Sequence, residues 1–492
     1  MTRRLVISAW LGFALAALFF YPLAVALQAD MYYLQWQPRH VAELAAVLAA
    51  LGLLIAVALF VLWPRSSRSA SLALIAIATI PLASFVAGVS RQLPFDDLLR
   101  AAWENRGVRL ALPSALAACV TVSVVLWPKA FNRWFRRLLI VLSPVSLLVF
   151  GSIIASAFHV VPTIAVDRAP GSAGARPGAE CAPVLALLFD ELSFSYLYDE
   201  NGHVRTDYPE IGRLSAEATN YLDVAAPARE TLISMPSFLA ARHLRDIRIE
   251  DGGIFEVTED GRLQRFSVSA QDGLFATARR LGFTTEMAGY YLPYCDLLGN
   301  LVDACRSMSF YNVSTTSDGF SLAGPVLTTL VLFPRQFPFG LLKNPPFARL
   351  QRKLVDVTAA FARRPMQGAR PVFRFVHFSV PHLPFVFDAA GYAPPLNPLQ
   401  TSPDTQYVRQ LRFVDRLFGE LAGQMRREGT YERATIVLLA DHGFRFGGRE
   451  ANPLQIPFIA KMARQTSRVD IATAVQGERL LKQVLERSCE VQ

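Results

Sequence analysis

The tetrapeptide Ala-Asp-His-Gly at residues 440–443 ends an apolar run that begins at Thr435. A β-branched apolar run of this length that stops at a turn predicts a buried strand of an α/β sheet. In such sheets ligands bind outside the carboxyl ends of the strands, which is where Asp441 and His442 would lie. An adjacent carboxylate and imidazole can hold a divalent cation, and the alternative is a capping aspartate beside a satisfied histidine. The rest of the chain must decide between the two.

Two other predicted strand ends carry the same chemical groups. Asp190 and Glu191 follow one strand, and His377 and His382 lie within and after another. Converging carboxylates and imidazoles suit one divalent metal ion, with Zn²⁺ or Mn²⁺ favoured over Mg²⁺ or Ca²⁺. Asp190 is the expected ligand because it directly follows its strand, whereas Glu191 faces solvent or adds a further ligand. His377 lies inside an apolar run, where we expect a satisfied core histidine.

A hydroxyl-rich segment containing Thr231 and Ser234 opens a predicted helix. Backbone N–H groups at a helix start attract anions, so a hydroxyl at this place faces a natural phosphate or sulfate site. We expect Ser234 to be the N-cap of that helix rather than a nucleophile, with Pro236 in the first turn.

The elements that precede these groups are long and apolar. The chain has 492 residues, of which 52% are hydrophobic, so it is too apolar for an ordinary soluble enzyme. An α-helix needs about 20 residues to cross the hydrocarbon core of a membrane. Five stretches meet this length and predict retained transmembrane helices: Leu5–Leu27, Val41–Trp63, Ser71–Val89, Leu110–Trp127 and Leu138–Val161.

Charge predicts the orientation of these spans. Residues 1–166 hold 13 Lys and Arg against 5 Asp and Glu, and the basic residues concentrate at the N-terminus and around residues 65–68 and 129–137. By the positive-inside rule the N-terminus is cytoplasmic, and after five crossings the rest of the chain is extracytoplasmic. We therefore expect a multi-pass membrane protein whose large C-terminal part is extracytoplasmic. The net charge of +9 is then a topological signal, and no basic surface for nucleic acid remains.

Four cysteines fall in the predicted extracytoplasmic part, as expected for an oxidising compartment. Cys295 and Cys305 bracket one loop and could form a disulfide, and Cys181 and Cys489 could join the two ends of the domain. The alternative, four buried thiols, stays open because spacing alone does not fix connectivity.

The chain divides into three predicted regions. Residues 1–165 form the transmembrane domain, residues 166–182 a Pro/Gly/Ala-rich linker, and residues 183–492 a catalytic domain. Strands that alternate with helices predict an α/β fold with a mainly parallel central sheet. The predicted strands are 183–189, 283–289, 371–378, 435–440 and 456–460, and the predicted helices are 209–219, 273–281, 350–363 and 405–427.

The order of these motifs resembles the alkaline phosphatase/sulfatase superfamily. An acid follows the first strand, a hydroxyl opens the next helix, and a Pro-His-x-Pro segment precedes Asp-His-Gly. The stretches 188–192, 208–214 and 456–461 are similar to bacterial sulfatase-like membrane proteins. Five spans before one such domain is the layout of the phosphoethanolamine transferases and lipoteichoic acid synthases.

The resemblance implies a role for each residue. Asp190, Asp441 and His442 would bind the metal, with Thr231 as nucleophile and fourth ligand, five positions before a proline. His382 would hold the transferred group or protonate the leaving oxygen. The implied activity moves a phosphoethanolamine or phosphoglycerol group from a membrane phospholipid, through phospho-threonine, to an envelope glycan or lipid.

Two alternatives remain open. A sulfatase needs formylglycine in a C/S-x-P-x-R motif, which Ser234-Met-Pro-Ser fits until Phe238 replaces the arginine. That departure weakens hydrolysis of sulfate esters, although a hydrolase of sulfate or phosphate esters is the second hypothesis. The third is a non-catalytic domain that binds anionic lipid or glycan and has no need to retain a cation.

Overall fold

A computed structural model describes most of the chain, and its residues fall into two compact units. Unit 1 comprises residues 1–162 and 314–346, and unit 2 comprises residues 163–313 and 347–492. The described residues are 2–21, 23, 38–62, 67–90, 119, 122–158, 181–250, 253–268, 272–308, 323, 325–326, 329, 345–393, 401–446, 448–449 and 452–490. The predicted linker lies outside these residues except for 181–182. The segment 314–346, which the sequence analysis placed in the catalytic domain, groups with unit 1.

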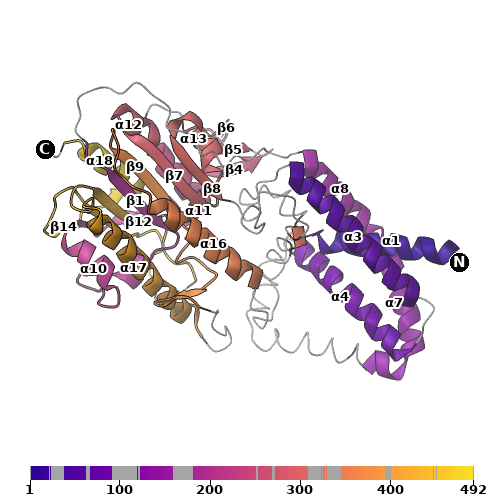
Figure 1. The fold of residues 1–492 in the computed structure, drawn as a ribbon. Helices are drawn as coiled ribbons and strands as arrows, with labels where there is room; N and C mark the ends of the chain where they lie inside the picture. Colours follow the sequence, from indigo (N-terminus) through magenta and orange to yellow (C-terminus); the bar gives the residue numbers. More distant parts are fainter. Residues whose placement is uncertain are drawn as a thin grey trace. The chain divides into compact units, whose positions relative to one another are not determined.

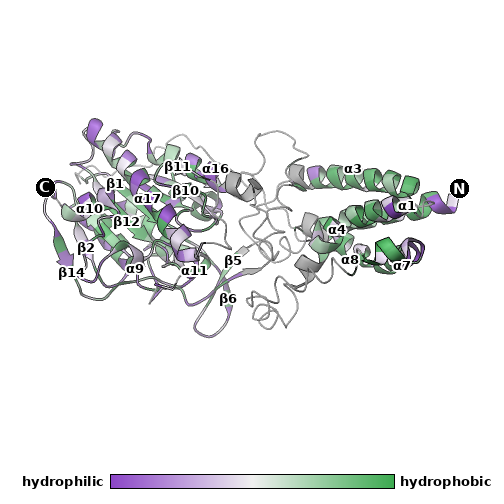
Figure 2. Cartoon of the chain, turned by 90° about the horizontal axis from the view of Figure 1, so that it is seen from below, coloured by the Kyte–Doolittle hydropathy of each residue, from purple (hydrophilic) through white to green (hydrophobic). Residues whose placement is uncertain are grey.

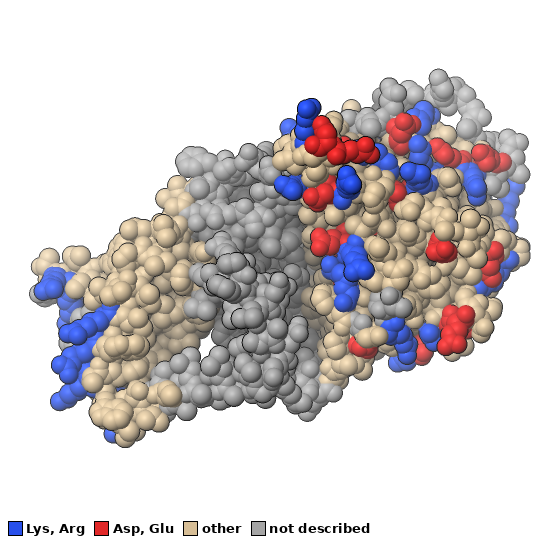
Figure 3. Space-filling view, turned by 180° about the vertical axis from the view of Figure 1, so that it is seen from behind, with Lys and Arg blue, Asp and Glu red and all other residues tan. Residues whose placement is uncertain are grey.

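Unit 1 is a bundle of apolar helices, drawn mainly in green in Figure 2. Its helices are α1 (Thr2–Phe19), α3 (Pro38–Leu62), α4 (Arg68–Ser90), α7 (Pro128–Leu142) and α8 (Val145–Phe158). Helices α1 and α3 pack closely because glycines face each other: a Cβ on Gly12 would lie 2.5 Å from the carbonyl oxygen of Gly52. Figure 3 shows Lys and Arg side chains gathered at one end of this unit.

The described residues contain four candidate membrane spans, whereas the sequence analysis expected five. They are Thr2–Phe19, Ala42–Leu62, Arg68–Phe85 and Pro128–Gly151. The predicted span 110–127 lies outside the described residues except for 119 and 122–127. The predicted span 138–161 is wrong as one continuous helix, because a turn at Ser143 and Pro144 separates α7 from α8. Pro144 has no N–H to donate to the preceding turn.

Unit 2 is built around an eight-stranded sheet with the order β14-β2-β13-β12-β1-β9-β7-β8. Strand β1 pairs in parallel with β12 and β9, and β7 pairs in parallel with β9 and β8. The pairs of β13 with β12 and β2 are antiparallel. The bounds are β14 (Val469–Ile471), β2 (Thr219–Tyr221), β13 (Phe458–Lys461), β12 (Thr435–Ala440), β1 (Val184–Phe189), β9 (Val372–Phe378), β7 (Thr284–Tyr290) and β8 (Ala304–Met308). The predicted α/β class with a mainly parallel central sheet is confirmed.

Helices flank the sheet in Figure 1, and the four predicted from the sequence are present. Helix α10 packs on α17, while α18 packs on α11 and α12. The helices are α9 (Phe194–Leu197), α10 (Pro209–Ala216), α11 (Thr231–Ala240), α12 (Leu274–Arg280), α13 (Tyr294–Leu298), η2 (Gly299–Leu301), α16 (Pro345–Ala362), α17 (Pro403–Arg427) and α18 (Gly477–Arg487). Smaller sheets join β3 (Val224–Ala225) to β15 (Val475–Gln476), β10 (Phe387–Asp388) to β11 (Gly391–Tyr392), and β4 (Ile247–Glu250) to β5 (Gly253–Val257) and β6 (Leu263–Arg265).

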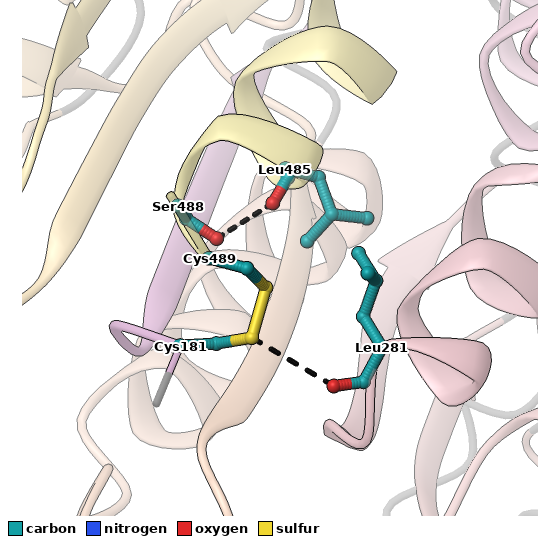
Figure 4. The surroundings of a disulfide bond; sticks show 5 residues. All are labelled: Cys181, Leu281, Leu485, Ser488 and Cys489. Atoms are coloured by element: carbon teal, nitrogen blue, oxygen red, sulfur yellow. Dashed lines mark hydrogen bonds between the residues drawn. A yellow bond between two sulfur atoms is a disulfide. The ribbon is translucent and has the colours of Figure 1, made fainter. Parts of the chain in front are cut away.

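Two disulfides join the cysteines that the sequence analysis paired. Cys295 and Cys305 link α13 to β8. The disulfide between Cys181 and Cys489 links the segment just before β1 to the residues just after α18, as Figure 4 shows. The second disulfide closes a loop of 308 residues and thereby ties the two ends of unit 2 together.

Candidate active site

Asp441 is the centre of a buried polar cluster at the carboxyl end of β12. Its Oδ1 accepts hydrogen bonds from the backbone N–H of Glu191 at 3.1 Å and of His442 at 2.9 Å. Its Oδ2 accepts a hydrogen bond of 2.7 Å from the Thr231 hydroxyl. Because β12 and β1 run in parallel and in register, their ends bring Asp441 and Glu191 together across 250 residues of sequence.

Asp190 and His442 complete a group that could hold a cation with Asp441. One ligand atom from each of the three side chains lies within 4.8 Å of the others. His442 Nδ1 is 2.9 Å from the carbonyl oxygen of Gly443, so Nδ1 carries the proton and donates it. The lone pair of Nε2 is therefore available at 3.3 Å from Asp441 Oδ2 and 4.0 Å from Asp190 Oδ1.

The charge of this cluster favours a cation. Asp190 Oδ1 is buried without a hydrogen-bond partner among the described residues. Burial, with the negative charges of Asp441 and Glu191, raises the pKa of Asp190. Although burial opposes it, His442 and the hydrogen bond from Thr231 lower the pKa of Asp441. Buried carboxylates this close together cannot all be ionised unless a positive charge balances them. A bound divalent ion would supply that charge, with Asp190, Asp441 and His442 as its ligands.

Thr231 is the first residue of α11, and its hydroxyl points at the same cluster. The residue before it, Glu230, is extended with a φ of −134° and forms the N-cap without a side-chain hydrogen bond. The Thr231 hydroxyl lies 3.4 Å from His442 Nε2, and only 7% of the residue is exposed. The helix start thus directs this oxygen toward the candidate cation ligands.

Ser234 is not the N-cap that the sequence analysis expected. It lies inside α11, because the helix already begins at Thr231, and Pro236 is also interior. The Ser234 hydroxyl accepts a hydrogen bond from the backbone N–H of Ala228 at 3.1 Å and donates to its carbonyl oxygen at 3.0 Å. The side chain therefore fastens the preceding loop to the helix and is fully buried.

His382 is held by the loop that follows β9. Its backbone N–H donates to the carbonyl oxygen of Asp190 at 3.0 Å, and its own carbonyl accepts from the Gln410 side chain at 2.8 Å. The ring Nδ1 lies 2.7 Å from the carbonyl oxygen of Leu383 and so donates to it. The Nε2 atom lies 3.9 Å from Glu191 Oε1, which places the imidazole beside the cluster.

His377 is a core histidine, as expected, but it is only half satisfied. Its Nδ1 lies 2.6 Å from the Tyr294 hydroxyl, while its Nε2 is buried without a partner among the described residues. Burial lowers the pKa of His377 to about 4, so the ring is neutral. Tyr294 reaches it across Gly289, where a Cβ would lie 2.6 Å from the tyrosine ring.

Glu191 does not face solvent, which was one of the two roles expected for it. Its side chain is fully buried, and its Oε1 accepts a hydrogen bond of 2.8 Å from Arg445 Nε. Its φ of 64° is rare for a residue with a Cβ, and the Tyr407 hydroxyl donates to its carbonyl oxygen at 2.7 Å. Contacts with Arg445 and Tyr407 therefore hold Glu191 in a backbone conformation that residues with a Cβ rarely adopt.

Arg445, Tyr407 and Gln410 were missed by the sequence analysis. Arg445 could have been found, since it follows His442 by three residues in the loop after β12. Tyr407 and Gln410 are three positions apart on one face of α17, a spacing that any amphipathic helix shows. No sequence signal separates these two from the core residues around them.

Several solved structures resemble unit 2 at low sequence identity. A phosphonate monoester hydrolase of Agrobacterium radiobacter is 12% identical with a TM-score of 0.38, covering 62% of this chain and 73% of its own. The PsFucS1 sulfatase of a Pseudoalteromonas species is 15% identical with a TM-score of 0.40, covering 63% and 67%. An alkaline phosphatase superfamily protein from Vibrio parahaemolyticus is 13% identical with a TM-score of 0.40, covering 63% and 68%.

A search of curated proteins finds no match to the sequence. The family model named Sulfatase matches residues 183–478, which is more than half of the chain and includes every residue of the cluster described above. The apolar helices before it agree with the membrane-anchored branch. The chain therefore belongs to the sulfatase family of the alkaline phosphatase superfamily.

Proposed function

We propose that this protein is a metal-dependent, membrane-anchored phosphotransferase. It moves a phosphoethanolamine or phosphoglycerol group from a membrane phospholipid to an envelope glycan or lipid, through a phosphorylated Thr231. Asp190, Asp441, His442 and the Thr231 oxygen would hold one divalent ion, Zn²⁺ or Mn²⁺, which stabilises the Thr231 alkoxide when bound.

One observation carries the proposal: the cluster engages Thr231 and leaves Ser234 out. The Thr231 hydroxyl donates to Asp441 at 2.7 Å, whereas the Ser234 hydroxyl forms hydrogen bonds with the backbone N–H and carbonyl oxygen of Ala228. A sulfatase would need the reactive aldehyde of formylglycine at residue 234. The geometry therefore favours a threonine nucleophile, the choice of a phosphoryl-transfer enzyme.

The reaction consists of two displacements at phosphorus. In the first, the Thr231 oxygen loses its proton and attacks; the P–O bond to the diacylglycerol oxygen breaks, and that oxygen takes up a proton. In the second, the acceptor hydroxyl loses its proton and attacks the phospho-threonine, which restores the Thr231 hydroxyl. Asp441 orients the nucleophile. His382, with Nδ1 fixed on Leu383, would in its protonated form give the Nε2 proton to the leaving oxygen and take a proton back from the acceptor hydroxyl in the second displacement, while Thr231 exchanges its own proton with solvent.

The membrane helices support a lipid donor, because the donor must reach the site from a bilayer. We propose a bacterial inner membrane, a cytoplasmic N-terminus and a periplasmic unit 2. Reporter fusions after residue 66 and residue 200 test this orientation. A cytoplasmic signal at 66 with an extracytoplasmic signal at 200 agrees with it, and a cytoplasmic signal at 200 contradicts the lipid-donor proposal.

The activity itself is tested with the purified full chain in vesicles of phosphatidylethanolamine or phosphatidylglycerol. We expect release of diacylglycerol from at least one lipid, lost in Thr231→Ala and retained in Ser234→Ala. Sulfate release from an aryl sulfate that survives Thr231→Ala but not Ser234→Ala would establish a sulfatase instead. A folded protein that retains no metal and turns over neither ester would be a binding domain.

A further inference from the structure

Arg445 contacts one of the buried carboxylates, that of Glu191, from the rim of the site. Its side chain is 31% exposed, while Glu191, to which its Nε donates at 2.8 Å, is fully buried. Although burial opposes it, the negative charges of Glu191, Asp190 and Asp441 raise the pKa of Arg445. The guanidinium therefore lies within the field of the whole cluster and still reaches solvent.

Most of its hydrogen-bonding capacity is unused. A guanidinium has five N–H donors, and the contact with Glu191 takes one of them. The two terminal nitrogens of Arg445 have no hydrogen-bond partner among the residues that the structure describes. Its Cζ also lies 5.6 Å from the centroid of the Phe446 ring, within the range of a cation–π contact.

A short chain of contacts connects this guanidinium to the nucleophile. Arg445 bonds the Glu191 side chain, the Glu191 backbone N–H bonds Asp441 Oδ1, and Asp441 Oδ2 bonds the Thr231 hydroxyl. The unusual φ of Glu191 is what lets its backbone face Asp441 while its side chain faces Arg445. The arginine is thus connected to the reacting oxygen through Glu191 and Asp441.

The charges leave a role for such a group. Asp190, Glu191 and Asp441 bring three negative charges, and a divalent ion with Arg445 balances them. A tetrahedral anion that enters the site then needs a positive, well-oriented donor, and the forked guanidinium matches such oxygens better than a point charge does.

We propose that Arg445 binds a non-bridging oxygen of the phosphoryl or sulfuryl group that Thr231 attacks, and that Glu191 positions its guanidinium. The inference rests on the proposed function for the identity of the reacting group. It adds a recognition residue for the oxyanion that lies outside the metal ligands and the nucleophile.

The test measures binding of inorganic phosphate to the metal-loaded full chain by calorimetry. Loss of one charge-assisted contact corresponds to roughly 10- to 100-fold weaker binding in Arg445→Gln. Arg445→Lys keeps the charge and should recover part of that loss. The matched control is Arg449→Gln in the same loop, where the exposed guanidinium lies 5.5 Å from the ring centroid of Tyr196. We expect this control to bind phosphate like the unchanged protein.

Three outcomes would overturn the proposal: a less than twofold change in Arg445→Gln, an equal loss in Arg449→Gln, or loss of the metal together with phosphate binding. Arg445→Lys binding no better than Arg445→Gln would also refute it, since charge would then not be what the residue supplies. The two proposals fail separately. Diacylglycerol release with unaltered phosphate affinity refutes the role of Arg445 alone, and phosphate binding through Arg445 without any ester turnover refutes the transferase alone.

Discussion

Two buried charged clusters lie in the same sheet of unit 2 and differ in how fully their polar atoms are paired. Between β7 and β9, Arg374 faces Glu286 across the strands and donates to it at 2.6 Å. Its remaining nitrogens donate to carbonyl oxygens at the end of α16, including Ala362 at 2.9 Å and Pro365 at 3.0 Å. This pair closes a helix end, and each of the three guanidinium nitrogens has a hydrogen-bond partner.

The cluster at the strand ends is the opposite case. Asp190 Oδ1, Glu191 Oε2 and His377 Nε2 are buried without partners among the described residues. Leaving such groups unpaired costs about 1–3 kcal/mol each, so a fold retains them where something else binds. The difference teaches that burial of charge alone does not mark a site, whereas unpaired and convergent charge does.

Removing a proposed metal ligand from the unpaired cluster should have the largest effect on the protein. In Asp441→Asn or His442→Ala the cation is under-coordinated, so the protein should purify folded with substoichiometric metal. Turnover should fall by about 10³-fold, since Lewis-acid stabilisation is worth several kcal/mol. Elemental analysis of the purified variants measures this, and full metal content in both would move the site elsewhere.

Breaking the paired cluster should instead affect stability alone. Arg374→Met leaves the buried Glu286 carboxylate and the carbonyl oxygens at the end of α16 without their partner, which should lower the free energy of unfolding by about 3–5 kcal/mol. The double variant Arg374→Met, Glu286→Leu removes both charges and should recover much of that loss. Thermal unfolding compares the three proteins. A drop in metal per folded molecule in any of them would show that the two clusters are not independent.

Glu478 provides a third case, because it is fully buried and neither carboxylate oxygen has a hydrogen-bond partner among the described residues, yet it is not one of the grouped candidate metal ligands. Burial raises its pKa, so a proton can neutralise this single carboxyl. A raised folded-state pKa adds stability that is fully present below the unfolded value of about 4.3 and is lost as the pH rises through the folded value. Glu478→Gln should therefore gain melting temperature over the unchanged protein as the pH rises, with metal and turnover unaltered. Equal shifts at pH 4 and pH 8 would contradict this.

The sequence analysis located the sheet and the cluster for one physical reason. The central strands β1, β12 and β9 are buried along their whole length, so apolar residues make up most of each strand and mark it in the sequence. Because these strands run in parallel, their carboxyl ends lie at the same edge of the sheet. The sequence analysis could therefore place Asp190, Asp441 and His442 in one site.

What the sequence analysis missed depends on the path of single side chains. Helix α11 starts at Thr231 rather than Ser234, and Glu191 turns toward Arg445 with a positive φ. Likewise the break at Pro144 falls inside an apolar stretch, where hydropathy has no signal. Such features are tertiary and leave little trace in composition or spacing.

The most direct test of the central claim is mass spectrometry of the intact and digested protein after incubation with phospholipid vesicles and metal. We predict a phospho-alcohol adduct on Thr231 that is absent in Thr231→Ala, present in Ser234→Ala, and lost when the acceptor is added. An aldehyde at residue 234, or an adduct that persists without Thr231, would contradict the account.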